Sequence, residues 1–255
     1  MRREGAPNSR RKLPALPGLE DSQEEDAMQL ARKPKWVSFD CYGTLIDTRA
    51  GYVEIWREIL TEKGIDPSPV LMDTVQAWGE EEFRLIQGSY KTYREILVES
   101  VEVTLRKYNH PVGPRDGRRL ADAWGTFPPY PDVKPILTAL KEQHRLAIIS
   151  NVDNDIIRQS VAGIGVEFDA LFTAEDCRAY KPNRIPFERA LQRMGVAPRD
   201  VLHVAFGYKY DHGTASEMGF MTAWINRRKL VLLPGARKFD LELPDLSGLP
   251  ALVGM

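Results

Sequence analysis

Short apolar runs recur along the chain and are separated by stretches with the spacing of helices. The runs are rich in Val, Ile and Leu, and they lie at residues 36–40, 146–151, 170–173, 201–205 and 222–226. A continuous apolar run of this length is typical of a strand that is buried on both faces. Helix-compatible segments at 132–144, 153–164, 185–194 and 214–218 stand between them. The alternation predicts an α/β fold, with a Rossmann-like parallel sheet and helices on both faces.

The stretch from about residue 48 to residue 129 departs from this alternation. Apolar residues recur there at spacings of three and four positions over 52–63, 69–88 and 90–108. This spacing predicts amphipathic helices, with Trp78, Phe83 and Ile86 on a buried face. We therefore expect a helical cap, 48–129, inserted into an α/β core formed by 36–47 and 130–233. A C-terminal tail, 234–255, should pack on the core or trail from it.

Residues 1–35 differ from the rest in composition. They contain a basic cluster at 10–12, an acidic run at 24–26 and several Pro, Gly and Ser residues. No apolar segment follows the early arginines, which argues against a secretory signal, and the acidic residues argue against a transit peptide. We interpret 1–35 as a disordered N-terminal extension.

Composition excludes several classes of partner. The net charge of −1 gives no sign of a surface for nucleic acid, and the apolar runs are too short to span a membrane. There are only two cysteines, Cys41 and Cys177, too few for a disulfide framework. Two cysteines fit a reducing compartment, so we expect a cytoplasmic protein. With nucleic acid and membrane excluded, we expect a small-molecule substrate.

Polar residues follow four of the predicted strands. They are Asp40 with Thr44, Ser150 with Asn151, Lys181, and Asp211. Ligands bind at the carboxyl ends of parallel strands, so these side chains should meet in one site. A carboxylate beside a lysine can stay ionised and act as a nucleophile, while hydroxyl and amide donors stabilise negative charge. We take Asp40, Thr44, Lys181 and Asp211 as the candidate catalytic residues.

Each of these residue types also has a purely structural use. Asp40, Asp211 and the Ser150–Asn151 pair could cap helices, and Lys181 could be a solvated loop residue. A cysteine that follows a buried strand usually contributes to packing, so we do not expect Cys41 to be a nucleophile. We interpret Cys177 and His203 as structural residues. The combination of all four groups in strand order favours a catalytic site.

The same residues carry a resemblance to a known family. The matching text is Phe39-Asp-Cys-Tyr-Gly-Thr-Leu45, Ile149-Ser-Asn151, Tyr180-Lys-Pro182, and His203-Val-Ala followed by Asp211. Four motifs in this order are a far stronger signal than any one of them. Over residues 36–227 the chain resembles the haloacid dehalogenase superfamily, and most of all the type II (S)-2-haloacid dehalogenases.

Two positions bear on metal chemistry. By resemblance, superfamily phosphatases carry a second aspartate where this chain has Tyr42, and an aspartate that binds magnesium where it has Gly207. Magnesium requires several oxygen ligands, so we expect no cofactor. A magnesium-dependent phosphatase with a reorganised site, and a HAD-fold binding protein without turnover, are the alternative functions.

The resemblance implies hydrolytic dehalogenation of a small (S)-2-haloacid through a covalent ester on Asp40. It also implies a homodimer. By resemblance, the family's arginine for the leaving halide follows a tryptophan. The nearest counterpart here is Trp78 followed by Gly79, and Arg84 lies five residues further on. The candidate substrate-binding residues are Cys41, Tyr42, Ser150, Asn151, Arg84 and Tyr208.

Overall fold

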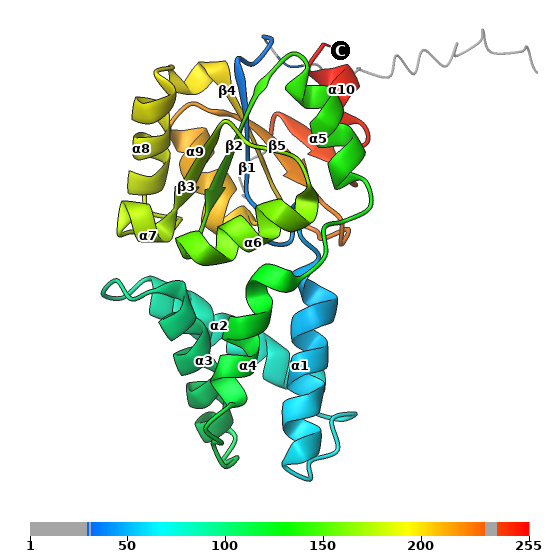
Figure 1. The fold of residues 1–255 in the computed structure, drawn as a ribbon, viewed down its shortest axis with the longest axis vertical. Helices are drawn as coiled ribbons and strands as arrows, with labels where there is room; N and C mark the ends of the chain where they lie inside the picture. Colours follow the sequence, from blue (N-terminus) through cyan, green and yellow to red (C-terminus); the bar gives the residue numbers. More distant parts are fainter. Residues whose placement is uncertain (1–29, 31, 233–238, 255) are drawn as a thin grey trace, which may run out of the picture.

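The computed structural model describes residue 30, residues 32–232 and residues 239–254. Six parallel strands form one sheet in the order β3-β2-β1-β4-β5-β6 (Figure 1). Their bounds are β1 Trp36–Phe39, β2 Arg145–Ser150, β3 Ala170–Thr173, β4 Val201–Ala205, β5 Met221–Ile225 and β6 Leu241–Leu243. The predicted α/β fold class is confirmed, and five of these strands lie within a residue or so of the predicted runs.

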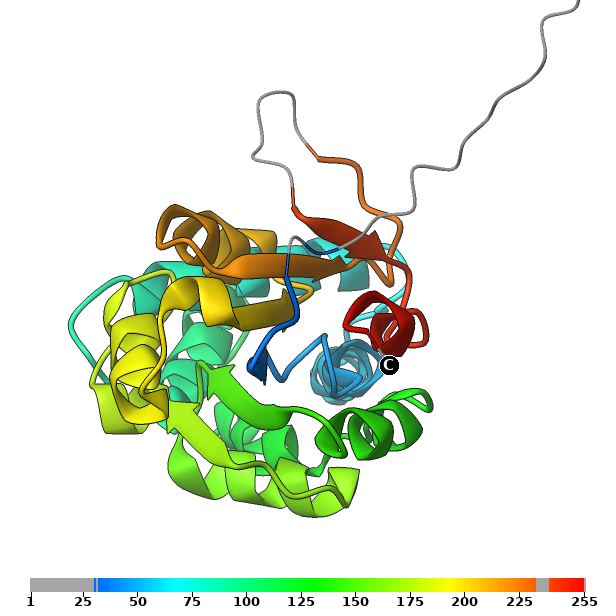
Figure 2. The same cartoon turned by 90° about the horizontal axis from the view of Figure 1, so that it is seen from above.

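Helices cover both faces of the sheet, which explains why its strands are apolar throughout. On one face, Val37, Phe39 and Ile148 pack with apolar residues of α5 (Val133–Lys141), α6 (Asn154–Ile164) and α10 (Leu249–Leu252). On the other face, Ala147 and Ile149 pack against α8 (Ile185–Met194) and α9 (Gly213–Glu217). The view from above shows these helices on either side of the strands (Figure 2).

Four helices between β1 and α5 form a separate layer beyond the carboxyl edge of the sheet (Figure 1). They are α1 Thr48–Glu62, α2 Leu71–Ile86, α3 Tyr93–Lys107 and α4 Asp116–Ala123, followed by the 3₁₀ turn η1, Trp124–Thr126. We call this layer the helical cap. The sequence analysis missed α4. Its close packing on α3 depends on Gly117, where a Cβ would lie 2.6 Å from the backbone of Val98.

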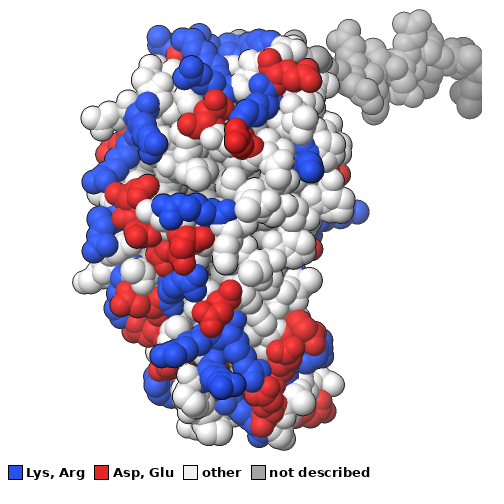
Figure 3. Space-filling view, viewed as in Figure 1, with Lys and Arg blue, Asp and Glu red and all other residues white. Residues whose placement is uncertain are grey.

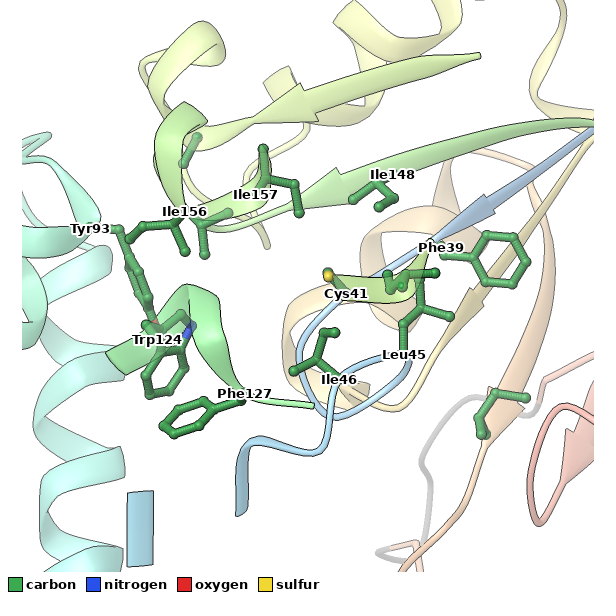
Figure 4. Close-up of a cluster of buried hydrophobic side chains, with 14 of the residues drawn as sticks. Phe39, Cys41, Leu45, Ile46, Tyr93, Trp124, Phe127, Ile148, Ile156 and Ile157 are labelled. Carbon is green, nitrogen blue, oxygen red and sulfur yellow. The ribbon is translucent and has the colours of Figure 1, made fainter. Parts of the chain in front are cut away.

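The cap and the core share one apolar cluster. Tyr93, Trp124 and Phe127 lie against Cys41, Ile46 and Ile156 (Figure 4). The β2–α6 loop also holds the start of α3, because the carboxylate of Asp153 accepts hydrogen bonds from the backbone amides of Tyr93 (2.8 Å) and Arg94 (2.9 Å). An anion at a helix N-terminus is favoured by the helix dipole. These contacts fix the cap over the carboxyl ends of the strands.

The structure describes the two ends of the chain to different extents. The predicted disordered extension lies almost wholly outside the described residues. The predicted C-terminal tail includes β6, which pairs with β5 at the edge of the sheet.

Acidic and basic side chains are interspersed on the face seen in Figure 3. Within the described ranges, no helix has the length and apolar character needed to cross a membrane.

Candidate active site

Side chains from four strand ends meet in a single cavity of about 290 Å³ between the sheet and the cap. Asp40 follows β1, Ser150 ends β2, Lys181 lies after the short helix α7 (Ala174–Cys177), and Asp211 follows β4. The predicted sheet topology places them together, because parallel strands end at one edge. Asp211 belongs to a turn of π-helix, η3 (Tyr208–His212), a geometry frequent at functional sites.

Lys181 lies at the centre of this site and is fully buried. Its ammonium donates hydrogen bonds to Asp40 Oδ1 at 3.0 Å, Asp211 Oδ1 at 2.5 Å and the carbonyl oxygen of Ile149 at 2.7 Å. A buried charge is tolerated only when it is paired and fully hydrogen-bonded, and Lys181 has three acceptors for its three protons. It is therefore no solvated loop residue.

Thr44 completes the support of Asp40. Its hydroxyl donates to Asp40 Oδ2 at 2.9 Å and accepts the backbone N–H of Phe206 at 2.8 Å. Each oxygen of the Asp40 carboxylate thus faces one donor. This arrangement fixes the direction of the carboxylate and links β1 to the end of β4.

The two carboxylates differ in their electrostatics. Burial would raise the pKa of Asp211, but the charge of Lys181 and the hydrogen bond from His203 lower it to about 2. Burial raises the pKa of Asp40, and Lys181 and Thr44 oppose this only in part. Burial lowers the pKa of Lys181, but the charges of Asp211 and Asp40 raise it by more than burial lowers it. The pKa of Lys181 is therefore raised, and its side chain stays an ammonium. Asp40 is thereby the more basic carboxylate, which favours it as the nucleophile.

His203, interpreted as structural from the sequence, supports Asp211 from within the core. Its Nε2 lies 2.9 Å from Asp211 Oδ1, and its Nδ1 lies 2.9 Å from the hydroxyl of Ser38. An ionised carboxylate can only accept, so Nε2 carries a proton and donates it to Asp211. Sequence reasoning missed this chain of contacts, since Ser38 and His203 lie far apart in the sequence and meet only because β1 pairs with β4.

The two polar residues after β2 have different surroundings. The Ser150 hydroxyl is buried at the cavity and has no hydrogen-bond partner among the described residues. Asn151 also lines the cavity, and its amide donates to the carbonyl of Lys181 at 2.9 Å and accepts the Lys181 N–H at 2.7 Å. The structure thus leaves Ser150 available for a ligand, while Asn151 holds the backbone of the site lysine.

Three predicted substrate-binding side chains do not reach the cavity, and these predictions are corrected. Cys41 is fully buried in the apolar cluster, because alternation along the chain turns it away from Asp40 (Figure 4). Arg84 lies on the outer face of α2, where its side chain is 63% exposed and pairs with Glu81. Tyr208 packs against Phe239 and does not line the cavity. Tyr42 does line it, and its hydroxyl is bonded to Ser160 at 2.9 Å.

The cavity contains further residues. Sequence reasoning missed Glu82 from the cap, Tyr210 from η3, and Arg228, whose guanidinium lies 4.6 Å from the centre of the Phe206 ring. Lys209 of η3, which the sequence suggested as a replacement polar contact, also lines the cavity. Trp78, predicted as core, is buried and also lines the cavity. Glu82 had a signal in the sequence: it lies four residues after Trp78, on the apolar face of α2, where an acid is unusual.

The alternative phosphatase function requires magnesium, and the carboxylates of the site are already engaged. Asp40 and Asp211 both bind the ammonium of Lys181. At Gly207 a Cβ would lie 3.0 Å from Asp211 Oδ2, so a side chain there would crowd this carboxylate. Among the described residues, no group of three or more His, Cys, Asp or Glu side chains is arranged to hold a metal ion. The residues do not fit a magnesium site.

Comparison with known proteins places the chain in a family. A family model for haloacid dehalogenase-like hydrolases matches residues 34–205. Haloacetate dehalogenase H-2 of Moraxella sp. (strain B) is 27% identical over 230 residues, which cover 88% of this chain and 100% of the relative. The (S)-2-haloacid dehalogenase of Pseudomonas sp. (strain YL) is 26% identical over 226 residues, 86% of this chain and 94% of the relative.

A solved structure has the same fold. It is the L-2-haloacid dehalogenase of Xanthobacter autotrophicus with chloropropionic acid covalently bound, at a TM-score of 0.71 and 23% identity. The match covers 87% of this chain and 99% of that one. The family model spans about two thirds of the chain and includes the Asp40, Ser150 and Lys181 motifs. The predicted superfamily is confirmed: the chain belongs to the haloacid dehalogenase-like hydrolases.

Proposed function

We propose that this protein hydrolyses the carbon–halogen bond of a small (S)-2-haloacid through an ester on Asp40, without a metal. One observation carries the proposal. The Asp40 carboxylate is aimed into the cavity between the sheet and the cap by Thr44 and by a fully buried lysine that also binds Asp211. The relatives named above as haloacetate and (S)-2-haloacid dehalogenases support the choice of substrate class.

In the first half-reaction an oxygen of Asp40 attacks the carbon that carries the halogen. The new C–O bond forms as the C–halogen bond breaks, and the halide leaves with the bonding electrons. Ser150 is placed to donate to the substrate carboxylate, because its buried hydroxyl has no other partner in the described structure. The cap side chains Tyr52, Trp78 and Trp124 line the cavity and exclude bulk water, which strengthens these interactions.

In the second half-reaction water attacks the carbonyl carbon of the ester. Lys181 and Thr44 each contact one oxygen of Asp40, so a donor remains at the carbonyl oxygen whichever oxygen forms the ester. This donor stabilises the oxyanion. Asp211 keeps Lys181 charged, and its Oδ2 has no hydrogen-bond partner among the described residues, so it can accept from the attacking water. The products are a 2-hydroxyacid, the free Asp40 carboxylate and one proton.

Halide release tests this function directly. The protein is incubated with chloroacetate and with each enantiomer of 2-chloropropionate, with and without EDTA. We expect turnover of chloroacetate and of the (S) enantiomer, at the same rate in EDTA. Absence of halide release across a panel of 2-haloacids would contradict the proposal and favour a binding protein. Loss of activity in EDTA that magnesium restores would contradict metal independence.

Replacing Ser150 with alanine separates substrate binding from folding. We expect KM for a 2-haloacid to rise about tenfold, because a hydrogen bond to the substrate carboxylate is lost, while kcat changes little. The midpoint of thermal unfolding should stay the same or rise slightly, since the hydroxyl has no partner in the described protein. Steady-state kinetics and calorimetry measure both. An unchanged KM would remove Ser150 from the binding site.

Two further predictions stay proposals. The homodimer is implied by the resemblance alone, and sedimentation of the purified chain would test it. The cytoplasmic location is favoured by the low cysteine content.

A further inference from the structure

Among the described residues, no arginine of the cap lines the cavity. Gly79 lines it on α2, and a Cβ built there would meet nothing within 4 Å. Open space at this position means that the backbone does not require glycine for close packing. Arg228 also lines the cavity, but it belongs to the core and lies over the Phe206 ring. On the cap side, a group for the departing halide has to come from the side chains next to Gly79.

Glu82 lies one helical turn after Gly79 and lines the same cavity. The residue is only 7% exposed, and the Tyr210 hydroxyl donates to Glu82 Oε2 at 3.1 Å. Tyr93 of α3 and Tyr180 are within electrostatic reach of this carboxyl group. With Oε2 held as an acceptor, Oε1 is the oxygen that can carry a proton and donate it in a hydrogen bond.

The protonation state of Glu82 depends on its burial. Burial raises the pKa of Glu82 to about 7, against the hydrogen bond from Tyr210 and the charge of Lys209. Burial likewise raises the pKa values of Tyr210, Tyr93 and Tyr180, so these neighbours stay neutral over the range in which Glu82 titrates.

Lys209 is the second polar group at this end of the cavity. Its ammonium lies 3.9 Å from the centre of the Phe83 ring and 4.9 Å from that of Tyr210. Among the described residues it has no hydrogen-bond or ion-pair partner. Burial lowers the pKa of Lys209, and the charges of Glu82 and Glu80 oppose this only in part. A cation with three unused donors lines the cavity beside an acid.

We propose that Glu82, as a neutral acid, donates a hydrogen bond to the departing halide, with the Lys209 ammonium beside it, in place of a cap arginine. The inference rests on the proposed dehalogenation. The negative charge that develops on the halogen as the C–halogen bond breaks is met by an O–H donor and a cation. The bonding electrons leave with the halide, and the proton stays on Glu82 or is regained from solvent. Ionised Glu82 would repel the halide.

Two variants of Glu82 test this role. Glu82→Gln keeps the shape and an N–H donor but cannot ionise, whereas Glu82→Leu removes the donor. In the wild type, kcat/KM for chloroacetate should fall as pH rises through about 7, because Glu82 loses its proton. Glu82→Gln should keep activity at pH 6 and lose this fall. Glu82→Leu should lower kcat by about tenfold or more at pH 6.

The dependence on the leaving group distinguishes donation from mere positioning. The loss in Glu82→Leu should be largest for fluoroacetate, smaller for chloroacetate and smallest for bromoacetate, since poorer leaving groups need more stabilisation. Equal losses for the three substrates, or a fall above pH 7 that persists in Glu82→Gln, would overturn the proposal. Glu81→Gln, on the outer part of the same helix, is the matched control and should keep the wild-type profile.

Folding and function are kept separate in this experiment. Because the acid is costly to ionise when buried, the Glu82→Gln variant should have a higher thermal midpoint than the wild type at pH 8 and a similar one at pH 5. Equal midpoints at both pH values would contradict the protonated state on which the proposal rests. If the wild type releases no halide at all, the dehalogenase function itself fails. If it releases halide and the variants behave as the wild type, only the role of Glu82 fails.

Discussion

Replacing Asp40 with asparagine is expected to lower kcat for halide release by at least about 10⁴-fold, because the amide cannot form the ester. The substitution is isosteric and leaves the hydrogen bond from Thr44 possible. Lys181 retains Asp211 as its counter-ion at 2.5 Å. We therefore expect an unchanged fold and a thermal midpoint equal to or above that of the wild type. Halide release and calorimetry on the same preparation measure both quantities.

The contrary result would be informative. A variant that keeps more than about a tenth of the wild-type kcat would show that water, and not Asp40, attacks the substrate carbon. A variant that loses activity together with its fold would be replaced by Asp40→Ser, which retains a small polar group at this position.

Replacing Lys181 with methionine has the largest expected effect on stability. The change leaves Asp40 and Asp211 buried without a counter-charge, and breaking a buried ion pair in this way costs about 3–5 kcal/mol. The folded-state pKa values of Asp40 and Asp211 should then lie above their unfolded-state values. Stability should accordingly be greatest at low pH and decrease as pH rises through the folded-state values. We expect kcat to fall by about 10³-fold or more.

A double variant separates the two effects of Lys181. Lys181→Met combined with Asp211→Asn removes the ammonium and one carboxylate, so much of the lost stability should return while activity does not. Chemical denaturation at pH 5 and pH 8 measures the free energy of unfolding. If Lys181→Met alone were as stable as the wild type at pH 8, the buried charge network described above would be wrong.

The strands could be predicted because each is buried on both faces and is therefore apolar throughout. β6, with the sequence Leu-Glu-Leu, could not, since it is short and lies at the exposed edge of the sheet. The helix α4 was missed for a related reason. Its eight residues contain a single large apolar side chain, Leu120, and its position depends on the close approach at Gly117 to α3. Tertiary contacts of this kind leave no periodic pattern in the sequence.

The candidate site was predictable where residues follow strands and not where the cap contributes. Asp40, Ser150, Lys181 and Asp211 share the cavity because the sheet topology brings their strand ends together. Arg84 was assigned from its distance along the chain, but it lies six residues after Trp78 and so faces away from the cavity. Glu82 lies four residues after Trp78, on the same face. Helical phase, more than proximity in sequence, decides which cap residues reach the substrate.

The nature of the nucleophile can be measured directly in oxygen-18 water. With enzyme in excess over a 2-haloacid, each molecule turns over at most once, and mass spectrometry then compares the product with the peptide that contains Asp40. The account predicts that the label appears in the Asp40 carboxylate, with unlabelled hydroxyacid as the product of this first turnover. Label in the product, with an unlabelled Asp40 peptide, would show direct attack by water and contradict the covalent mechanism.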